Sequence, residues 1–232
     1  TANTALRLPS GTTEQRPTSP STGEWRYNTT TNLVEFYDGA DWRELQSEDI
    51  PPTPSENFNV ILYTGNSSTQ SITGVGFKPD WVWIKERGPA AENHNLIDST
   101  RGTSKILASN NNNAEFTSTR FTSFDADGFT LANNNETNDS GSTYVAWCWK
   151  ANGGTTSSNT EGSITSTVQT NTKARFSIIK YTGNGTTGAT IGHNLGVVPD
   201  MFIVKKLGSG STNWRVYHKG IDSASPQNYN VA

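Results

Sequence analysis

The chain has 232 residues and a formal net charge of −3, so one or two domains with sizeable cores are expected. This acidic balance argues against nucleic acid or an anionic membrane as a main partner, because both require a basic surface. Seven Trp, nine Phe and seven Tyr stand in a matrix rich in Thr, Ser, Asn and Gly, a mixture typical of all-β extracellular or virion proteins.

Residues 1–22 predict an extended arm, because the stretch 9–22 contains three prolines and almost no apolar side chains. Residues 23–46 follow with short strand-like segments, EWRYNT, LVEFYDG and DWREL, separated by turn signals such as Asp38-Gly39. We interpret them as a small three-stranded β module. Three short strands are about the minimum for independent stability, so the module is expected to pack against a neighbour. Its aromatic residues are Trp25, Tyr27, Phe36, Tyr37 and Trp42.

Residues 47–57 contain three prolines and predict a linker, which marks the clearest domain boundary. An internal repeat follows it. The sequence YTGN at 63–66 recurs at 181–184, an offset of 118 residues, and the Pro-Asp pair at 79–80 recurs at 199–200 after a two-residue insertion. Each copy is interpreted as strand, Thr/Gly-rich turn, Pro-Asp and strand. The expected order is a β-sandwich-like repeat 1 over 58–154, a Thr/Ser-rich linker over 155–175 and an incomplete repeat 2 over 176–232.

Repeat 1 closes with STYVAWCWKANGG, in which Tyr144–Trp149 is apolar on both faces and therefore predicts a central strand. Nothing in repeat 2 corresponds to this closing segment. If both copies fold alike, repeat 2 cannot complete its sheet with the residues shown, so we expect the polypeptide to continue beyond Ala232. Four tryptophans alternate along the expected strands of repeat 1, and most are expected in the core: Trp81, Trp83, Trp147 and Trp149.

No local catalytic motif is present. The three histidines lie in no metal-binding or triad-like pattern, and the chain has no nucleophile elbow or phosphate-binding loop. We therefore predict no enzyme activity and no cofactor. A glycan-hydrolysing carboxylate pair needs only spatial proximity, so a depolymerase remains an alternative, with Asp98 and Glu115 as candidate members. Ordinary surface carboxylates are the competing interpretation.

Metal binding has one weak candidate, the stretch DADG with Asp125 and Asp127 two residues apart before a glycine. Asp-Gly is also a turn signal, and the full calcium loop is missing, so we predict a turn. The single cysteine, Cys148, lies in an apolar run and is expected to be a buried free thiol. No apolar run approaches about 18 residues, so no transmembrane helix is predicted.

A glycan or protein receptor would need exposed aromatic faces beside polar groups. The polar run around Trp214 offers such a set in repeat 2, and a corresponding region lies in repeat 1. In repeat 1 the pair Asp98 and Arg101 has a second interpretation, as an ion pair that holds a loop. The candidate receptor residues are Trp214, Arg215, Tyr217, His218, His94, Asp98 and Arg101.

The first part of the chain resembles a short module that recurs in tail fibres and other appendages of tailed bacteriophages. The resemblance rests on GTT at 11–13, QRP at 15–17, RYNT at 26–29 and the G-x-x-W ending at Trp42. From Phe58 onward the chain is similar to a unit of fibre proteins of marine phages, including cyanophages. GF at 76–77, PDWVWIK at 79–85 and YVAWCWK at 144–150 carry that similarity, together with DS at 98–99, RG at 101–102 and DGFTL at 127–131.

This resemblance implies an external virion appendage, most simply a trimeric tail fibre that displays β-domains for attachment to the host surface. The aromatic residues of the small module would then pack between subunits. The implied partners are two further copies of the chain, other tail or capsid proteins through the N-terminal region, and a host glycan or protein. The alternative is a structural connector or capsid fibre that spaces other components without contacting a receptor.

Overall fold

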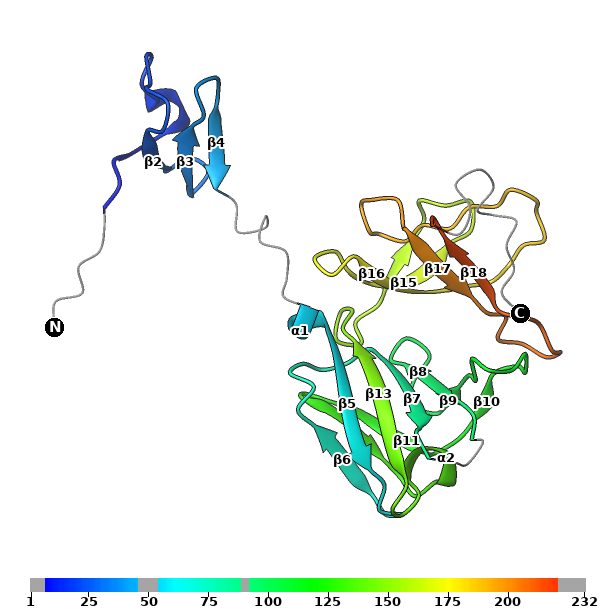
Figure 1. Cartoon of the computed structure of the whole chain (residues 1–232). Helices are drawn as coiled ribbons and strands as arrows, with labels where there is room; N and C mark the ends of the chain where they lie inside the picture. The colour runs from blue at the N-terminus through cyan, green and yellow to red at the C-terminus, as the bar shows by residue number, and fades with distance from the viewer. Residues whose placement is uncertain (1–6, 46–53, 89–91, 221–232) are drawn as a thin grey trace, which may run out of the picture. The chain divides into compact units, whose positions relative to one another are not determined.

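The computed structural model describes residues 7–45, 54–88 and 92–220 (Figure 1). The chain divides into two compact units, Thr1–Pro51 and Pro52–Ala232, which are described separately. Nearly all regular structure is β-strand, which confirms the all-β prediction. The division falls inside the predicted linker, of which residues 47–53 lie outside the described part. The last four linker residues instead form a short helix, α1 (Pro54–Asn57), since proline is compatible with a first helical turn.

The three strands predicted over 23–46 are β2, β3 and β4, and a fourth strand joins them in the sheet order β1-β2-β3-β4. The extra strand comes from the arm, which was predicted to run extended over 1–22. The arm folds back because the edge of β2 has free backbone groups: Tyr27 N–H donates to Pro9 and Thr29 N–H to Gly11. The elements are β1 (Ser10–Gly11), the 3-10 helix Thr13–Gln15, β2 (Trp25–Asn28), β3 (Leu33–Tyr37) and β4 (Trp42–Leu45).

The interior of the N-terminal unit is charged. Glu35 on β3 is fully buried and accepts hydrogen bonds from Arg16 Nη2 at 2.5 Å and Asn28 Nδ2 at 3.1 Å. Arg26 Nε lies 3.4 Å from the same carboxylate. The hydrogen bond from Arg16 lowers the pKa of Glu35 despite the opposing effect of burial. Because Arg16 belongs to the arm and Glu35 to the sheet, this polar cluster fastens one to the other.

In repeat 1, two antiparallel sheets share one apolar core. The larger sheet has the order β5-β13-β7-β8, with β5 (Phe58–Thr64), β13 (Thr143–Trp149), β7 (Trp81–Glu86) and β8 (Asn95–Asp98). The smaller sheet has the order β11-β12-β6, with β11 (Phe121–Asp125), β12 (Gly128–Leu131) and β6 (Gln70–Thr73). The remaining short elements are β9 (Lys105–Ile106), β10 (Phe116–Thr117) and α2 (Asn135–Asn138).

Strand β13 lies between β5 and β7, which confirms the predicted central strand. It pairs antiparallel with both neighbours along nearly its whole length. Its inward side chains, Tyr144, Ala146 and Cys148, are fully buried in the core. Burial raises the pKa of the Cys148 thiol to about 12, so this residue is the buried free thiol that the sequence predicts.

The segment 155–175 is not a linker, as the sequence had indicated, but contains two strands. A three-stranded sheet has the order β14-β15-β16, with β14 (Ser157–Asn159), β15 (Ser166–Asn171) and β16 (Phe176–Tyr181). Threonine-rich composition is ambiguous because β-branched threonine also suits a pleated strand. A separate two-stranded sheet, β17 (Met201–Val204) with β18 (Arg215–His218), follows.

One buried glutamine joins β15 to repeat 1. Gln169 is 1% exposed, and its Oε1 accepts from Asn152 N at 3.1 Å and Gly154 N at 2.7 Å. Its Nε2 donates to Ser99 Oγ and Thr100 Oγ1, both at 2.9 Å. The four partners come from two separate turns of repeat 1, so this single side chain holds both turns against β15.

Replacement of Glu35 by Gln is expected to destabilise the N-terminal unit by about 3 kcal/mol, because it leaves the buried Arg26 guanidinium without its counter-charge. The measurement is amide hydrogen exchange in β2 and β3 of the full chain at pH 7. Glu14→Gln, at an exposed acidic residue of the same unit, is the matched control. Equal exchange in the two variants would show that the charge of Glu35 does not stabilise the sheet.

The same variant has a defined pH dependence. Since the pKa of Glu35 is lowered on folding, its stabilising effect is present above the unfolded pKa of about 4.3 and is lost as the pH falls through the folded pKa. Exchange in β2 and β3 should therefore differ between wild type and Glu35→Gln at pH 7 and become similar in strong acid. A difference that persists unchanged at the lowest pH would contradict this explanation.

Replacement of Gln169 by Leu is expected to lower the free energy of unfolding of the second unit by about 2 kcal/mol, because its polar partners lose their hydrogen bonds. Urea titration followed by tryptophan fluorescence measures this change. Thr167→Val, at an exposed position of the same strand, is the control. A midpoint equal to that of the control would show that Gln169 does not hold the turns.

Candidate binding surfaces

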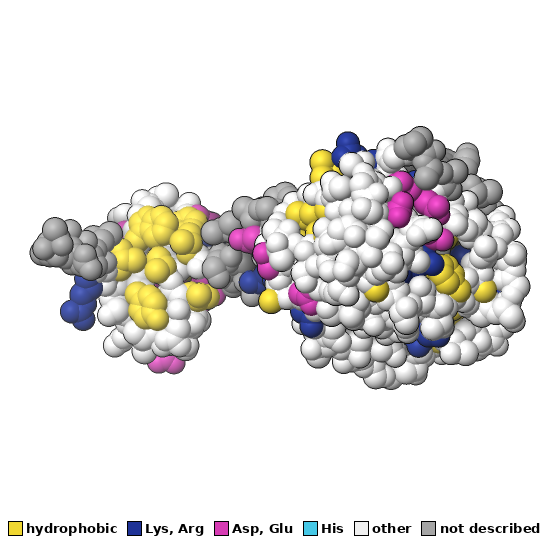
Figure 2. Space-filling view, turned by 90° about the horizontal axis from the view of Figure 1, so that it is seen from below, with side chains coloured by type: hydrophobic (Ala, Val, Ile, Leu, Met, Phe, Trp, Pro, Cys, Tyr) yellow, Lys and Arg dark blue, Asp and Glu magenta, His cyan; other side chains and the backbone are white. Residues whose placement is uncertain are grey.

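One face of the N-terminal sheet is open and mostly apolar, with Arg43 as its charged member. Strand pairing places Trp25 opposite Phe36, and Val34 between Tyr27 and Leu45. We call these five residues the aromatic face. Trp25 is 46% and Leu45 53% exposed, and the Trp25 and Phe36 rings stack with centroids 5.2 Å apart. Figure 2 shows hydrophobic side chains gathered on the surface of this unit. The unit thus buries charged side chains and exposes Trp25 and Leu45, the reverse of ordinary packing.

The five aromatic residues predicted to pack between subunits do not share one face. Tyr37 and Trp42 pair with each other on the opposite face, with ring centroids 5.7 Å apart. The Arg26 guanidinium lies 5.9 Å from the centroid of the Trp42 ring, so these two aromatics belong to the side that carries the polar cluster. Only Trp25, Tyr27 and Phe36 of the predicted set lie on the aromatic face.

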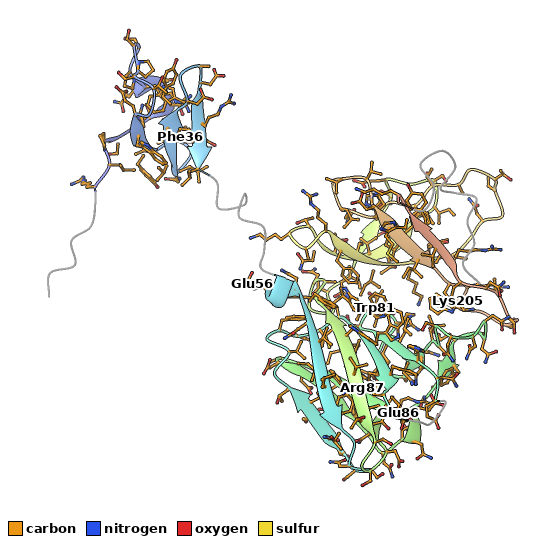
Figure 3. All side chains as sticks on the ribbon, viewed as in Figure 1. Phe36, Glu56, Trp81, Glu86, Arg87 and Lys205 are labelled. Carbon is orange, nitrogen blue, oxygen red and sulfur yellow. The ribbon has the colours of Figure 1, made fainter. Side chains whose placement is uncertain are left out.

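The four tryptophans of repeat 1 are half-buried on the outer side of the larger sheet, whereas most had been expected in the core. Strand alternation is the reason, because Val82 and Ile84 occupy the inward positions of β7 with no exposed surface. Trp81 stacks on Trp149 with centroids 4.4 Å apart, and Phe176 of β16 stacks on Trp81 at 6.0 Å. Figure 3 labels Trp81 where repeat 1 meets the following segment. The tryptophan layer therefore forms part of an internal contact.

A polar groove lies beside this layer. Its volume is about 570 Å³, and Lys150, Lys173 and Asn152 contribute to its wall. Asn171 also lines it and donates to Asn57 Oδ1 at 2.7 Å. The groove combines amide and ammonium groups, which can donate to hydroxyl groups of a ligand, with the Glu56 carboxylate, which can accept from them. Sequence reasoning missed it because its residues come from four separate stretches of the chain.

The candidate receptor residues of repeat 1 are held by internal contacts. His94 Nδ1 accepts from Trp83 Nε1 at 2.8 Å, and burial, followed by the nearby Lys85, lowers the pKa of His94. Asp98 Oδ2 lies 2.5 Å from Arg101 Nε, which is the ion pair that the sequence offered as the second interpretation.

Glu115, the other carboxylate of the possible depolymerase pair, lies 2.9 Å from Arg101 Nη1. Arg101 also donates to the backbone carbonyls of Leu96 and Lys105. Both carboxylates of the pair are thus engaged by one nearly buried guanidinium that ties β8 to the loop after it.

The candidate residues of repeat 2 divide between internal contacts and surface. Trp214 was predicted as a surface aromatic, but it is half-buried and its ring N–H lies within hydrogen-bond distance of the Ala108 and Asn111 carbonyls. Tyr217 stacks on Phe202 with centroids 4.8 Å apart. Arg215 and His218 are exposed. The tryptophan therefore anchors β18 to a loop of repeat 1, and two of the four predicted residues remain on the surface.

The stretch DADG forms the turn between β11 and β12. Asp127 accepts from the backbone N–H groups of Gly74 and Gly76 at 3.0 and 2.5 Å. Asp125 accepts from Ser123 Oγ and Thr130 Oγ1. These bonds occupy the carboxylates with protein donors. Within residues 7–45, 54–88 and 92–220 no cluster of three or more His, Cys, Asp or Glu has metal-binding geometry.

The described residues also contain no helix long and apolar enough to cross a membrane. A search of curated proteins and of solved structures found no match to the chain. A family model described as "Domain of unknown function (DUF7483)" matches residues 53–231, which is well over half of the sequence. The match includes repeat 1, the β14-β15-β16 sheet and the β17–β18 hairpin. The chain therefore belongs to the DUF7483 family.

Proposed function

We propose that this chain is a structural protein of a virion appendage, most simply a phage tail fibre, which presents its β-domains to the host surface for attachment. The aromatic face of the N-terminal unit carries the proposal. A sheet of four short strands that exposes Trp25 at 46% and Leu45 at 53% has an apolar surface fit for a partner. The sequence resemblance to phage fibre modules includes this same segment.

The partner in this proposal is two further copies of the chain. Three aromatic faces around a common axis would bury side chains that one small sheet leaves in water. The polar cluster around Glu35 supports such use, because it gives the sheet an interior of its own and leaves the aromatic face free for assembly. Three weak receptor sites on one fibre would gain about 10²–10⁴ in avidity.

A connector or capsid fibre is the second candidate, and the same aromatic face favours it. In that case the face binds a different virion protein and the chain alone stays monomeric. The two candidates therefore differ in the oligomeric state of the isolated chain. The carboxylates considered for a depolymerase, Asp98 and Glu115, are both bound to Arg101, so we do not propose an enzyme.

Light scattering of the full chain is expected to give a mass near three times 25.2 kDa. The double variant Trp25→Ser with Leu45→Ser should shift the mass to that of the monomer, because it removes the two most exposed apolar side chains of the aromatic face. Val60→Ser, at a position 41% exposed in repeat 1, should leave the trimer intact. A monomeric wild type would overturn the trimer and favour the connector.

Attachment itself is tested with the fluorescently labelled full chain on a panel of marine bacteria that includes cyanobacteria. Saturable binding to at least one strain is expected, and the monomeric double variant should bind more weakly because avidity is lost. Periodate oxidation of the cells distinguishes a glycan receptor from a protein one. If the trimer binds no strain of the panel but binds purified virion parts, the result favours the connector function over host attachment.

A further inference from the structure

The hairpin β17–β18 of repeat 2 reproduces β7–β8 of repeat 1 with a constant shift of 120 residues. Trp81 pairs with Asp98 in repeat 1, and Met201 pairs with His218 in repeat 2. A backbone hydrogen bond beside the hairpin is also repeated: Ser99 N to Asp80 O at 2.8 Å, and Lys219 N to Asp200 O at 2.9 Å. The two copies therefore share local structure as well as sequence.

Strand β16 is in turn the counterpart of β5, because the sequence YTGN ends both strands. In repeat 1, β13 lies between β5 and β7 and pairs with both. In the described part of repeat 2, no strand joins β16 to β17. β16 is the outer strand of the sheet β14-β15-β16, and β17 pairs only with β18. Each of the two strands therefore has one edge of unpaired backbone groups.

The side chains of β17 also lack the neighbours that would cover them. Its sequence MFIV is apolar at every position, a pattern of strands covered on both faces. Yet Met201 is 49%, Phe202 48% and Ile203 39% exposed. At the position equivalent to Phe202, Val82 of repeat 1 has no exposed surface. β17 therefore has the side chains of a central strand but lies at the edge of its sheet.

We propose that β16 and β17 form an acceptor for one further extended strand with the chemistry of β13. The strand would add antiparallel to both edges, as β13 does between β5 and β7. Repeat 1 defines the occupant: six or so residues, uncharged, with apolar side chains on both faces. This inference needs neither the trimer nor host attachment, so it stands or falls separately from the proposed function.

The probe is a synthetic peptide of residues 142–150 with Cys148→Ser, flanked by lysines for solubility. It is added to the full chain, and amide hydrogen exchange is followed by mass spectrometry. Exchange in segments that cover β16 and β17 should slow by about tenfold at saturating peptide, while β5 and β7 stay unchanged. The matched control peptide carries Ala146→Pro, which removes a ladder donor in the middle of the strand.

A variant of the chain locates the site. Ile203→Lys places a charge on β17 and should weaken peptide binding at least about tenfold, which corresponds to about 1.4 kcal/mol. Val198→Lys, at a position 86% exposed just before the strand, should bind the peptide as wild type does.

Three results would overturn the proposal. The first is no slowing of exchange in β16 and β17, or equal slowing with the proline peptide. The second is a change confined to β5 and β7, which would mean that the peptide displaces β13 in repeat 1. The third is full protection of β16 and β17 before peptide is added, in a chain that light scattering shows to be oligomeric. In that case a second copy of the chain already occupies the edges.

Discussion

The pairing of β13 with both β5 and β7 is the constraint on which the larger unit depends. This strand closes the larger sheet of repeat 1 and sends Tyr144, Ala146 and Cys148 into the core that the smaller sheet shares. Its partners lie far from it in sequence, so a long loop must close before the sheet is complete. Where no such strand joins the corresponding elements, as in the part of repeat 2 up to residue 220, apolar strands have open edges and exposed side chains.

The N-terminal unit is small, and a buried ion cluster takes the place of a large apolar core in it. Its interior holds a buried carboxylate, Glu35, bound by side chains of the arm and of β2, whereas Trp25 and Leu45 are exposed on the surface. A buried ion cluster contributes little net stability over a packed apolar core, but it fixes one arrangement, since any other leaves a buried charge unpaired. The arrangement it fixes is the one that presents the aromatic face. Both units thus expose apolar surface at defined strands.

Local pattern was enough to predict the all-β fold, the internal repeat, the central strand β13 and the buried thiol, because alternation and apolar runs are properties of single segments. Features that depend on distant partners were not predictable. The arm folds onto β2 through backbone groups, and Trp214 is anchored by carbonyls 103 and 106 residues away. The strands β14 and β15 were missed because threonine and serine are common in both linkers and strands. The groove beside Lys150 and Lys173 was missed because only folding brings its residues together.

Whether the repeat closes depends on a strand of the β13 type. Residue-level amide exchange of the chain alone, by NMR, tests this dependence most directly. We expect strong protection of the Trp83 amide, which faces β13, and exchange at least about a hundredfold faster for the equivalent amide of Ile203, on the open edge of β17. Equal protection of the two strands in a monomeric chain would show that repeat 2 is already closed without such a strand, and that β13 does not have this role.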